Sequence, residues 1–315
     1  MKYKDWLDEW LRNYVKISSK QRTFMCYSDI VRLHIIPVMG EYEMQDIAPM
    51  ELQHFVSVLL QSGNKRTGLG LSANSVNGII TVIQNSLKTA YSVGLIEDYA
   101  ADKIKRPKIN ESRVICFTVA EQQAIERGIL SGNKPKLFGI VLCLYTGLRI
   151  GELLALTWSD IDLQKGMLSV TKTVYDGRDE NGRFARITDT PKTETSQREI
   201  PLSTQIMGLL RELKKKSASE YVVASNRVPV SVRAYQRSFD RLLVCLNIPH
   251  KGFHALRHTF ATRALECGMD VKTLSEILGH KNPAVTLNRY VHSLMEHKRD
   301  MMNRLGKIFS PVYKK

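Results

Sequence analysis

The chain has 315 residues, of which 43% are hydrophobic and 24% are charged, proportions that are ordinary for a soluble globular protein. Its length suggests two domains, each large enough for its own hydrophobic core. The 46 lysines and arginines outnumber the 31 acidic residues, which leaves a net charge of +15. This charge favours a polyanionic partner, with nucleic acid ahead of the alternative of a merely basic protein.

The membrane and secreted classes of protein are disfavoured. The longest apolar run, residues 137–145, is too short to span a bilayer, and the chain has no signal peptide. The cysteines lie far apart without paired spacing, as expected for small buried side chains in a reducing compartment; they are Cys26, Cys116, Cys143, Cys245 and Cys267. We therefore expect a cytoplasmic protein.

Residues 1–103 predict a small helical bundle. Apolar residues recur at helical spacing near the N-terminus and again before Pro37 and Gly40, which are expected to end the second helix. Two more helices are expected, one ending near Gly63 and one opening with Ser72 as its N-cap. The polar and basic residues 104–114 have no hydrophobic period and predict an interdomain linker.

Residues 115–292 predict a larger mixed domain, followed by a helical tail over 293–315. Thr118 with an acid three residues on predicts a capped helix, and the apolar run at 137–145 predicts a buried one. Further helices are expected at about 203–216, 231–246, 254–267, 270–278 and 283–292, with Asp270 and Asn282 as caps.

Strands are expected between these helices. Residues 167–175 alternate like one strand, and 177–190 predict a turn and a return strand that complete a hairpin. REIPL (198–202) predicts a third short strand. The predicted fold class is therefore mainly α with a small antiparallel β-sheet.

The stretch FHALRH, residues 253–258, predicts a functional site. His254 and His258 lie one helical turn apart and could hold zinc, but Ala255 stands where a zinc-protease helix needs glutamate. No cysteine or carboxylate follows at ligand spacing, so a metal site is disfavoured. Arg257 instead offers a planar fork that matches phosphate oxygens.

Other segments add groups suited to a phosphoryl centre. Arg149 in TGLRIGE precedes an expected helix start, and LGHKNPAVTLNRY contributes His280 and Tyr290. Two fixed cations, imidazoles and a phenol are compatible with a phosphorus atom whose oxygens gain charge while the phenol attacks it.

The sequence resembles the tyrosine recombinases, or phage-integrase family, and looks most like integrases of conjugative transposons and phages of Gram-positive bacteria. The motifs that carry the resemblance follow the family's order over roughly 113–292; they are TGLRIGELLAL with Arg149, PKTETSQREIPL with Lys192, HALRHTFAT with His254 and Arg257, LGH with His280, and RY with Tyr290. The first half looks like the family's helical core-binding (SAM-like) domain, with a less specific match.

The resemblance implies a catalytic role for each motif residue. Tyr290 would attack the scissile phosphate and leave a 3′-phosphotyrosine and a free 5′-hydroxyl. Arg149 and Arg257 would hold the nonbridging oxygens, and Lys192 would protonate the leaving oxygen. His254 would assist proton removal or bind the phosphate, and His280 would donate a hydrogen bond to it. Neither metal nor ATP is required by this chemistry.

The resemblance also implies partners. Two domains would clamp duplex DNA in a C shape, and four protomers would exchange strands through a Holliday junction to integrate or excise a mobile element. The tail after Tyr290 would pack on a neighbouring protomer. An excisionase and a host DNA-bending protein would fit. Such integrases often carry a further small N-terminal arm-binding domain, whereas this sequence begins directly at the core-binding helices, so a shortened chain and a simpler integrase both stay open.

Weaker hypotheses concern residues outside the motifs. Glu152 is expected to support Arg149, and His258 to be a structural group. DNA contacts are expected from a basic turn, the helix after it, the hairpin and a later helix stripe; the candidates are Lys65, Arg66, Thr67, Asn74, Asn77, Thr81, Arg178, Arg183, Arg186, Arg233, Arg237 and Arg241.

Two alternative functions stay open at this stage. A type IB topoisomerase shares the chemistry, but the tail and the small helical first domain argue against it. A DNA-binding regulator that kept the fold without activity would form no covalent DNA adduct. The presence of all six motif residues argues against the second alternative.

Overall fold

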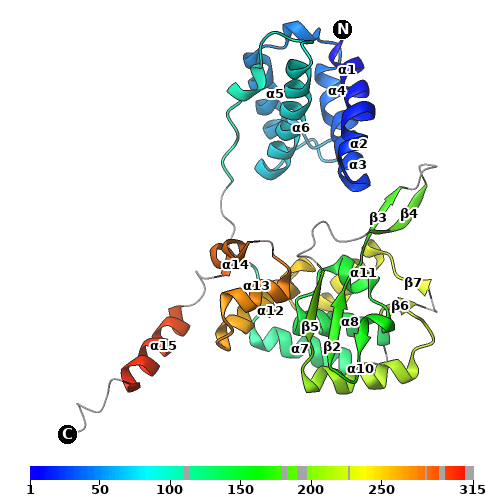
Figure 1. The fold of residues 1–315 in the computed structure, drawn as a ribbon, viewed down its shortest axis with the longest axis vertical. Helices are drawn as coiled ribbons and strands as arrows, with labels where there is room; N and C mark the ends of the chain where they lie inside the picture. The colour runs from blue at the N-terminus through cyan, green and yellow to red at the C-terminus, as the bar shows by residue number, and fades with distance from the viewer. Residues whose placement is uncertain are drawn as a thin grey trace. The chain divides into compact units, whose positions relative to one another are not determined.

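The computed structural model divides the chain into two compact units, Met1–Ser112 and Arg113–Lys315. It describes residues 1–109, 114–132, 134–178, 183–189, 197–225, 228–280, 282–290 and 295–308. These residues form mostly helices with small antiparallel sheets (Figure 1), which confirms the predicted fold class. In the described ranges, no helix is long and apolar enough to cross a membrane.

The first unit is a helical bundle around one apolar core. Trp6 and Trp10 are buried in it, and the Trp6 indole nitrogen donates to the Ser86 carbonyl oxygen at 3.1 Å. Its helices, some joined through π-helical turns at Leu11–Val15 and Val31–Ile35, are α1 (Tyr3–Trp10), α2 (Lys16–Ser18), α3 (Gln21–Ile30), α4 (Ile36–Met39), α5 (Pro49–Ser62) and α6 (Ala73–Ser92). Ser72 caps α6 as predicted, accepting from the Ser75 amide at 3.2 Å.

The prediction that Pro37 helps to end the second helix was wrong. Pro37 lies in the first turn of α4, and the helix runs on to Met39 before Gly40. Proline lacks an amide hydrogen and usually interrupts a helical ladder. Here a π-helical turn precedes it, in which the Ile36 amide bonds back to the Val31 carbonyl oxygen. This wider turn lets the helical path continue through the proline.

The segment predicted as a linker begins packed against the first unit, with Ile104 in its hydrophobic core. Ile104 is 7% exposed, and the Lys105 amide donates to Gln53 Oε1 at 2.9 Å. Arg106 donates to Thr81 Oγ1 at 3.2 Å and to Gln84 Oε1 at 2.6 Å. Residues 104–106 are therefore bound to α5 and α6.

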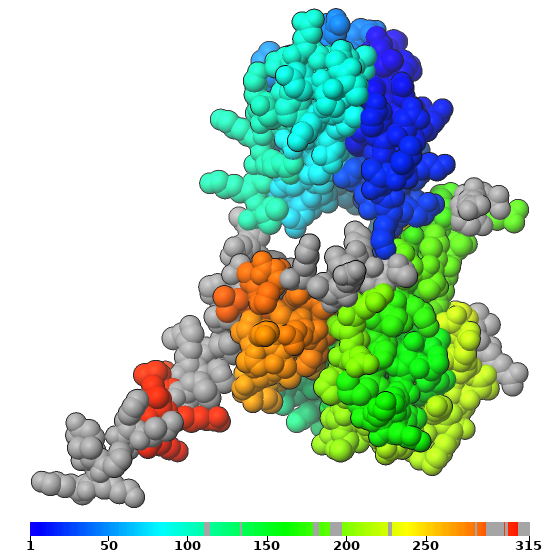
Figure 2. Space-filling model, viewed as in Figure 1, coloured from blue at the N-terminus to red at the C-terminus, as the bar shows by residue number. Residues whose placement is uncertain are grey.

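The second unit is built around α8 (Phe138–Thr146), which is buried along almost its whole length. Helix α12 (His254–Glu266) packs against α8, and α13 (Val271–Leu278) packs between α12 and α14 (Pro283–Tyr290). The surface of α12 to α14 is orange in Figure 2. The other helices of this unit are α7 (Val119–Leu130), α9 (Ile150–Ala155), α10 (Thr204–Lys216), α11 (Val232–Cys245) and α15 (Met295–Ile308).

The predicted helix caps of this unit are confirmed. Thr118 and Glu121 form a reciprocal capping box at the start of α7. Asp270 accepts from the Thr273 amide at 2.9 Å, and Asn282 accepts from the Ala284 amide at 2.9 Å.

Among the residues that the structure describes, the strands form two separate antiparallel sheets and a short hairpin. One sheet has the order β1 (Ile161–Asp162), β2 (Met167–Val170) and β5 (Arg198–Pro201). The second consists of β3 (Thr173–Arg178) and β4 (Phe184–Asp189), and the short hairpin joins β6 (Ala224–Ser225) to β7 (Val228–Pro229).

The prediction of one strand over 167–175 was therefore wrong. Val170 pairs with Arg198 in one sheet, whereas Thr173 pairs with Asp189 in the other. Buried side chains lie on both sides of the break at even-numbered positions, with Leu168, Val170 and Val174 all buried. A period of two cannot reveal such a change of partner strand, because it records only which face is buried.

Candidate active site

The C-terminal end of α13 binds three arginines from distant parts of the chain. Arg198 Nε donates to the Ile277 carbonyl oxygen at 2.5 Å, and Arg257 Nη2 donates to that of Leu278 at 2.6 Å. Arg149 Nη2 lies 3.4 Å from the Gly279 carbonyl oxygen. The last carbonyls of a helix carry partial negative charge and lack partners within the helix. This helix end therefore brings the predicted residues Arg149 and Arg257 together.

Arg149 lies between two helices at a turn that needs glycine. Helix α8 ends at Gly147, whose left-handed backbone has a φ of 66°. A Cβ atom there would lie 2.6 Å from a Phe260 ring carbon and 2.8 Å from a Leu278 methyl carbon. Arg149 then precedes α9 with extended backbone, and its side chain is 37% exposed. The turn thus holds a partly exposed guanidinium beside a buried core.

Glu152, which was expected to support Arg149, binds both its backbone amide and its side chain. Its carboxylate accepts from the Arg149 amide at 2.9 Å and from Arg149 Nη1 at 2.7 Å. It also pairs with Arg198, whose Nη2 lies 2.9 Å from Oε2. Burial alone would raise the pKa of Glu152, but the hydrogen bonds and charges of Arg198 and Arg149 outweigh it and lower the pKa to about 2. The carboxylate is therefore ionised at neutral pH.

Arg257 is held in a buried cluster that includes His280. Its side chain donates to the Gly147 carbonyl oxygen at 2.8 Å, and Nη2 lies 3.0 Å from His280 Nε2. His280 follows Gly279, which ends α13 with a φ of 64°. Its other ring nitrogen, Nδ1, lies 2.7 Å from Thr286 Oγ1 on α14. The histidine therefore joins the buried arginine to the helix that carries Tyr290.

His254 and His258 lie one turn apart at the start of α12, as predicted. His254 is exposed, and the two rings meet edge to face with centroids 4.5 Å apart. No group of three His, Cys, Asp or Glu side chains in the described parts of the chain could hold a metal ion.

Of the two remaining predicted catalytic residues, Tyr290 is described by its backbone only, and Lys192 is not among the described residues. Tyr290 is the last residue of α14, which packs on α13 next to the arginine cluster. Its side chain lies outside the described atoms. Lys192 falls in 190–196, which lies outside the described residues.

The predicted DNA-binding residues of the first unit differ in solvent exposure. Lys65, Arg66 and Thr67 are exposed in a turn that Asn64 closes, because Asn64 Oδ1 accepts from the amides of Arg66 and Thr67. Asn74 on α6 is also exposed.

Asn77 and Thr81 instead bind the segment that follows the bundle. Asn77 Nδ2 donates to the Pro107 carbonyl oxygen at 3.1 Å, and Thr81 Oγ1 accepts from Arg106 at 3.2 Å. Both side chains are half-buried by these contacts. Their surroundings therefore include protein partners that the sequence pattern did not reveal.

The three arginines of the β3–β4 hairpin also differ in solvent exposure. Arg178 and Arg183 are exposed near its tip, and the Arg178 guanidinium lies 4.9 Å from the centre of the exposed Phe184 ring. Arg186 is half-buried, donates to the Leu154 carbonyl oxygen and lies over the Tyr221 ring. Burial lowers the pKa of Arg186. Its guanidinium is thus used within the fold.

The basic stripe on α11 is present as predicted. Arg233, Arg237 and Arg241 are all exposed on one face of the helix. The N-terminus of α11 is bound to the hairpin, because Asp176 on β3 accepts from the amides of Val232 and Arg233. The stripe and the hairpin therefore belong to one connected surface.

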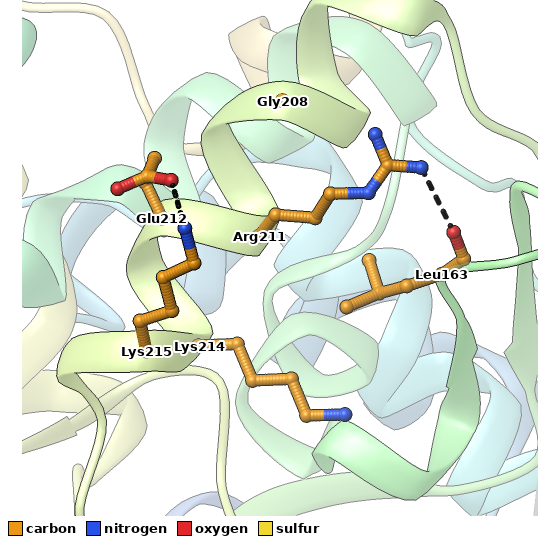
Figure 3. A pocket seen from close by; sticks show the side chains of 6 residues that line it. All are labelled: Leu163, Gly208, Arg211, Glu212, Lys214 and Lys215. Carbon is orange, nitrogen blue, oxygen red and sulfur yellow. Dashed lines mark hydrogen bonds and ion pairs between the residues drawn. The ribbon is translucent and has the colours of Figure 1, made fainter.

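A further basic hollow lies on α10 and holds none of the predicted residues (Figure 3). It has a volume of about 400 Å³ and is lined by Leu163, Gly208, Arg211, Glu212, Lys214 and Lys215. Arg211 donates to the Leu163 carbonyl oxygen at 3.1 Å, and Lys215 pairs with Glu212 at 2.7 Å. The hollow is therefore partly neutralised by its own walls.

Two residues of the site were missed from the sequence. Arg198 was visible in REIPL but was assigned only to a strand, although it completes the cluster around Glu152. Thr286 stands one helical turn before Tyr290, a spacing that places both on the same face of α14. That spacing was the available signal for Thr286.

Comparisons with known proteins identify the family to which the chain belongs. Residues 104–297 match the model of the phage integrase family, and residues 2–60 match that of the phage integrase N-terminal SAM-like domain. A tyrosine recombinase XerC-like protein of Caldanaerobacter subterraneus subsp. tengcongensis is 28% identical, over 97% of this chain and 83% of the relative. The transposase from transposon Tn916 of Enterococcus faecalis is 30% identical, over 71% of this chain and 60% of the relative.

Solved structures share the fold. The Tn1549 transposon integrase in complex with a circular intermediate DNA superposes with a TM-score of 0.80 at 22% identity, covering 97% of this chain and 99% of the other. A lambda integrase tetramer bound to a Holliday junction gives a TM-score of 0.68 at 22% identity, covering 90% of this chain and 78% of the other. Since one family model spans more than half of the sequence, the chain belongs to the phage integrase family, that is, to the tyrosine recombinases.

Proposed function

We propose that this recombinase cuts and rejoins DNA at specific sites through Tyr290, in the integration and excision of a mobile element. The observation that carries the proposal is the cluster at the end of α13, where Arg149, Arg257 and His280 meet beside the helix that ends at Tyr290. Two permanent cations and an imidazole, beside a helix whose last residue is a tyrosine, suit phosphoryl transfer, in which negative charge builds on the nonbridging oxygens.

Each residue has a proposed part in the reaction. The Tyr290 oxygen attacks the scissile phosphorus, the 5′-oxygen leaves, and a 3′-phosphotyrosine forms. Arg149 and Arg257 bind the nonbridging oxygens, since guanidinium groups match them in shape and charge. Lys192 protonates the leaving oxygen. His254 assists removal of the tyrosine proton or binds the phosphate, and His280 donates a hydrogen bond to the phosphate.

The two units have separate proposed roles. The first unit supplies the core-binding domain, residues 1–103, which binds the duplex. Residues 104–114 act as the linker, and residues 115–292 act as the catalytic domain. The exposed turn at Lys65, Arg66 and Thr67 and the exposed stripe at Arg233, Arg237 and Arg241 support a phosphate-binding surface on each unit.

The assembly is proposed to be a tetramer acting through a Holliday junction, with the 293–315 tail bound to a neighbouring protomer. Helix α15 supports this, because the apolar side chains Met302 and Leu305 on it are 65% and 42% exposed. An excisionase and a host DNA-bending protein would complete the system.

A nicked-DNA assay tests the proposed chemistry. The protein is incubated, without metal or nucleotide, with nicked DNA from the ends of its own element, beside a Tyr290→Phe control. A denaturant-resistant adduct that disappears in the control is expected. A two-site strand-exchange assay then separates a recombinase from a topoisomerase. Tight binding without any adduct would contradict the proposal and favour a DNA-binding regulator.

A further inference from the structure

Thr286 lies at a position that links the proposed nucleophile helix to the phosphate site. It is on α14, one turn before Tyr290, and its side chain is 0% exposed. Its hydroxyl oxygen lies 2.7 Å from His280 Nδ1 and 2.7 Å from Ser275 Oγ on α13. A single buried hydroxyl therefore joins α13, α14 and the imidazole ring.

The neighbours of His280 decide where its proton lies. Arg257 Nη2 is 3.0 Å from His280 Nε2, and a guanidinium can only donate. Nε2 must therefore accept, which places the proton of the neutral ring on Nδ1. Nδ1 then donates to Thr286 Oγ1, and the Thr286 hydroxyl hydrogen is left to donate to Ser275.

The proposed reaction requires the other tautomer of His280, with the proton on Nε2. To donate to a phosphate oxygen, Nε2 must carry the proton. When the ring takes a proton from water at Nε2 and loses the one on Nδ1 to water, Nδ1 becomes an acceptor. A carboxylate beside Nδ1 could only accept and would hold the proton there. A hydroxyl can turn and donate instead, while Ser275 turns to donate to Thr286.

We propose that Thr286 is a positioning residue for His280: its hydroxyl holds the ring against Arg257 and lets Nε2 change from accepting a hydrogen bond to donating one to the phosphate. This inference rests on the proposed role of His280. Helix α14 then has a second role besides carrying Tyr290. Its packing on α13 places the Thr286 hydroxyl beside His280 Nδ1, where the hydroxyl can accept from one tautomer of the ring and donate to the other.

Two substitutions separate the hydroxyl from the shape of the side chain. Thr286→Val keeps the volume and removes the hydroxyl, whereas Thr286→Ser keeps the hydroxyl and removes a methyl group. Loss of one hydrogen bond is expected to slow adduct formation on nicked DNA about tenfold in Thr286→Val, with most of the rate restored in Thr286→Ser. Thr262→Val, at another buried threonine on α12, is the matched control and is expected to keep the wild-type rate.

A second readout does not depend on catalysis. Nitrogen chemical shifts of the ¹⁵N-histidine-labelled, DNA-free protein report which ring nitrogen of His280 carries the proton, with His280→Gln identifying the signals. The proton is expected on Nδ1 in the wild type. A proton on Nε2 in the free protein would overturn the inference.

The outcomes separate this inference from the function on which it rests. An absence of adduct with the wild-type protein refutes the proposed function, and the role of Thr286 in it falls as well. Cleavage by the wild type and by Thr286→Val at equal rates refutes the inference alone. A loss in Thr286→Val that Thr286→Ser does not restore assigns the effect to packing and also refutes it.

Discussion

Glu152 and Arg198 form a buried ion pair between the first turn of α9 and the first residue of β5. Glu152 Oε2 lies 2.9 Å from Arg198 Nη2, and both side chains are 5% exposed. The same carboxylate binds the side chain of Arg149 at 2.7 Å. One carboxylate shared by two guanidinium groups can neutralise only one of their two positive charges, as the proposed binding of a phosphate by Arg149 requires.

Replacing Arg198 by methionine should therefore destabilise the second unit. The change leaves a buried carboxylate without its main counter-ion, and breaking such a pair costs about 3 kcal/mol of unfolding free energy. Urea denaturation measures the loss. Arg211→Met is the control, because that arginine is exposed and donates to one backbone carbonyl; its effect should stay below about 0.5 kcal/mol. Equal midpoints for both variants would contradict the structural role of Arg198.

The Glu152 carboxylate should also make stability depend on pH in acid. Its pKa is lowered from 4.5 to about 2 in the folded chain. A lowered pKa stabilises the fold above the unfolded value, and this stabilisation is lost as the pH falls from about 4.5 towards 2. The difference in unfolding free energy between wild type and Glu152→Gln should thus shrink across that window. A difference that stays constant between pH 7 and pH 3 would count against the lowered pKa.

Gly147→Ala should lower the unfolding free energy by straining the turn that precedes Arg149. The new methyl group meets Phe260 and Leu278 at less than 3 Å, and the positive φ adds strain. Together these cost about 3 kcal/mol. Gly268→Ala is a matched control, since Gly268 also follows a helix with a φ of 90° but has open space around it; strain alone costs about 1 kcal/mol. Thermal or urea denaturation of both variants compares them, and equal losses would show that crowding at Gly147 is unimportant.

The α11 stripe should contribute to DNA affinity by neutralising phosphates. Changing Arg233, Arg237 and Arg241 to glutamine should weaken binding more at low salt than at high salt. The slope of log affinity against log salt is negative. It should become shallower by about 0.9 for each phosphate that the variant no longer neutralises. Fluorescence anisotropy with a duplex at several salt concentrations measures this slope.

The control for the stripe removes the same number of charges from another surface. Arg211, Lys214 and Lys215 on α10 line the hollow of Figure 3 and are changed to glutamine together. Their loss should leave the slope near that of the wild type. A similar fall in both triple variants would assign the effect to net charge rather than to the α11 surface.

Much of this architecture could be predicted from local signals. Ser72, Thr118 and Asp270 mark helix starts because their side chains satisfy backbone amides that a helix leaves unpaired, and each cap is present. The helices of the second unit likewise follow their hydrophobic period. The motif residues Arg149, Arg257 and His280 are brought together.

The features that the sequence did not predict share one physical origin: they depend on interactions between segments far apart in sequence. The path through Pro37 depends on a π-helical turn that no composition rule signals. The break between β2 and β3 depends on which strand each one pairs with. Arg198 and Thr286 gain their importance from Glu152 and His280, and only the folded chain reveals those pairings.

The end of α13 also orders events during synthesis. Arg149, Arg198 and Arg257 leave the ribosome before the carbonyl groups of residues 277–279 that bind them. Glu152 can already bind Arg149 and Arg198, but until that helix emerges Arg257 lacks the carbonyl group that places it beside them, and Tyr290 follows later still. A nascent chain thus contains the basic residues proposed to bind DNA before it contains the proposed phosphate site, and a chain truncated ahead of α13 lacks both His280 and Tyr290.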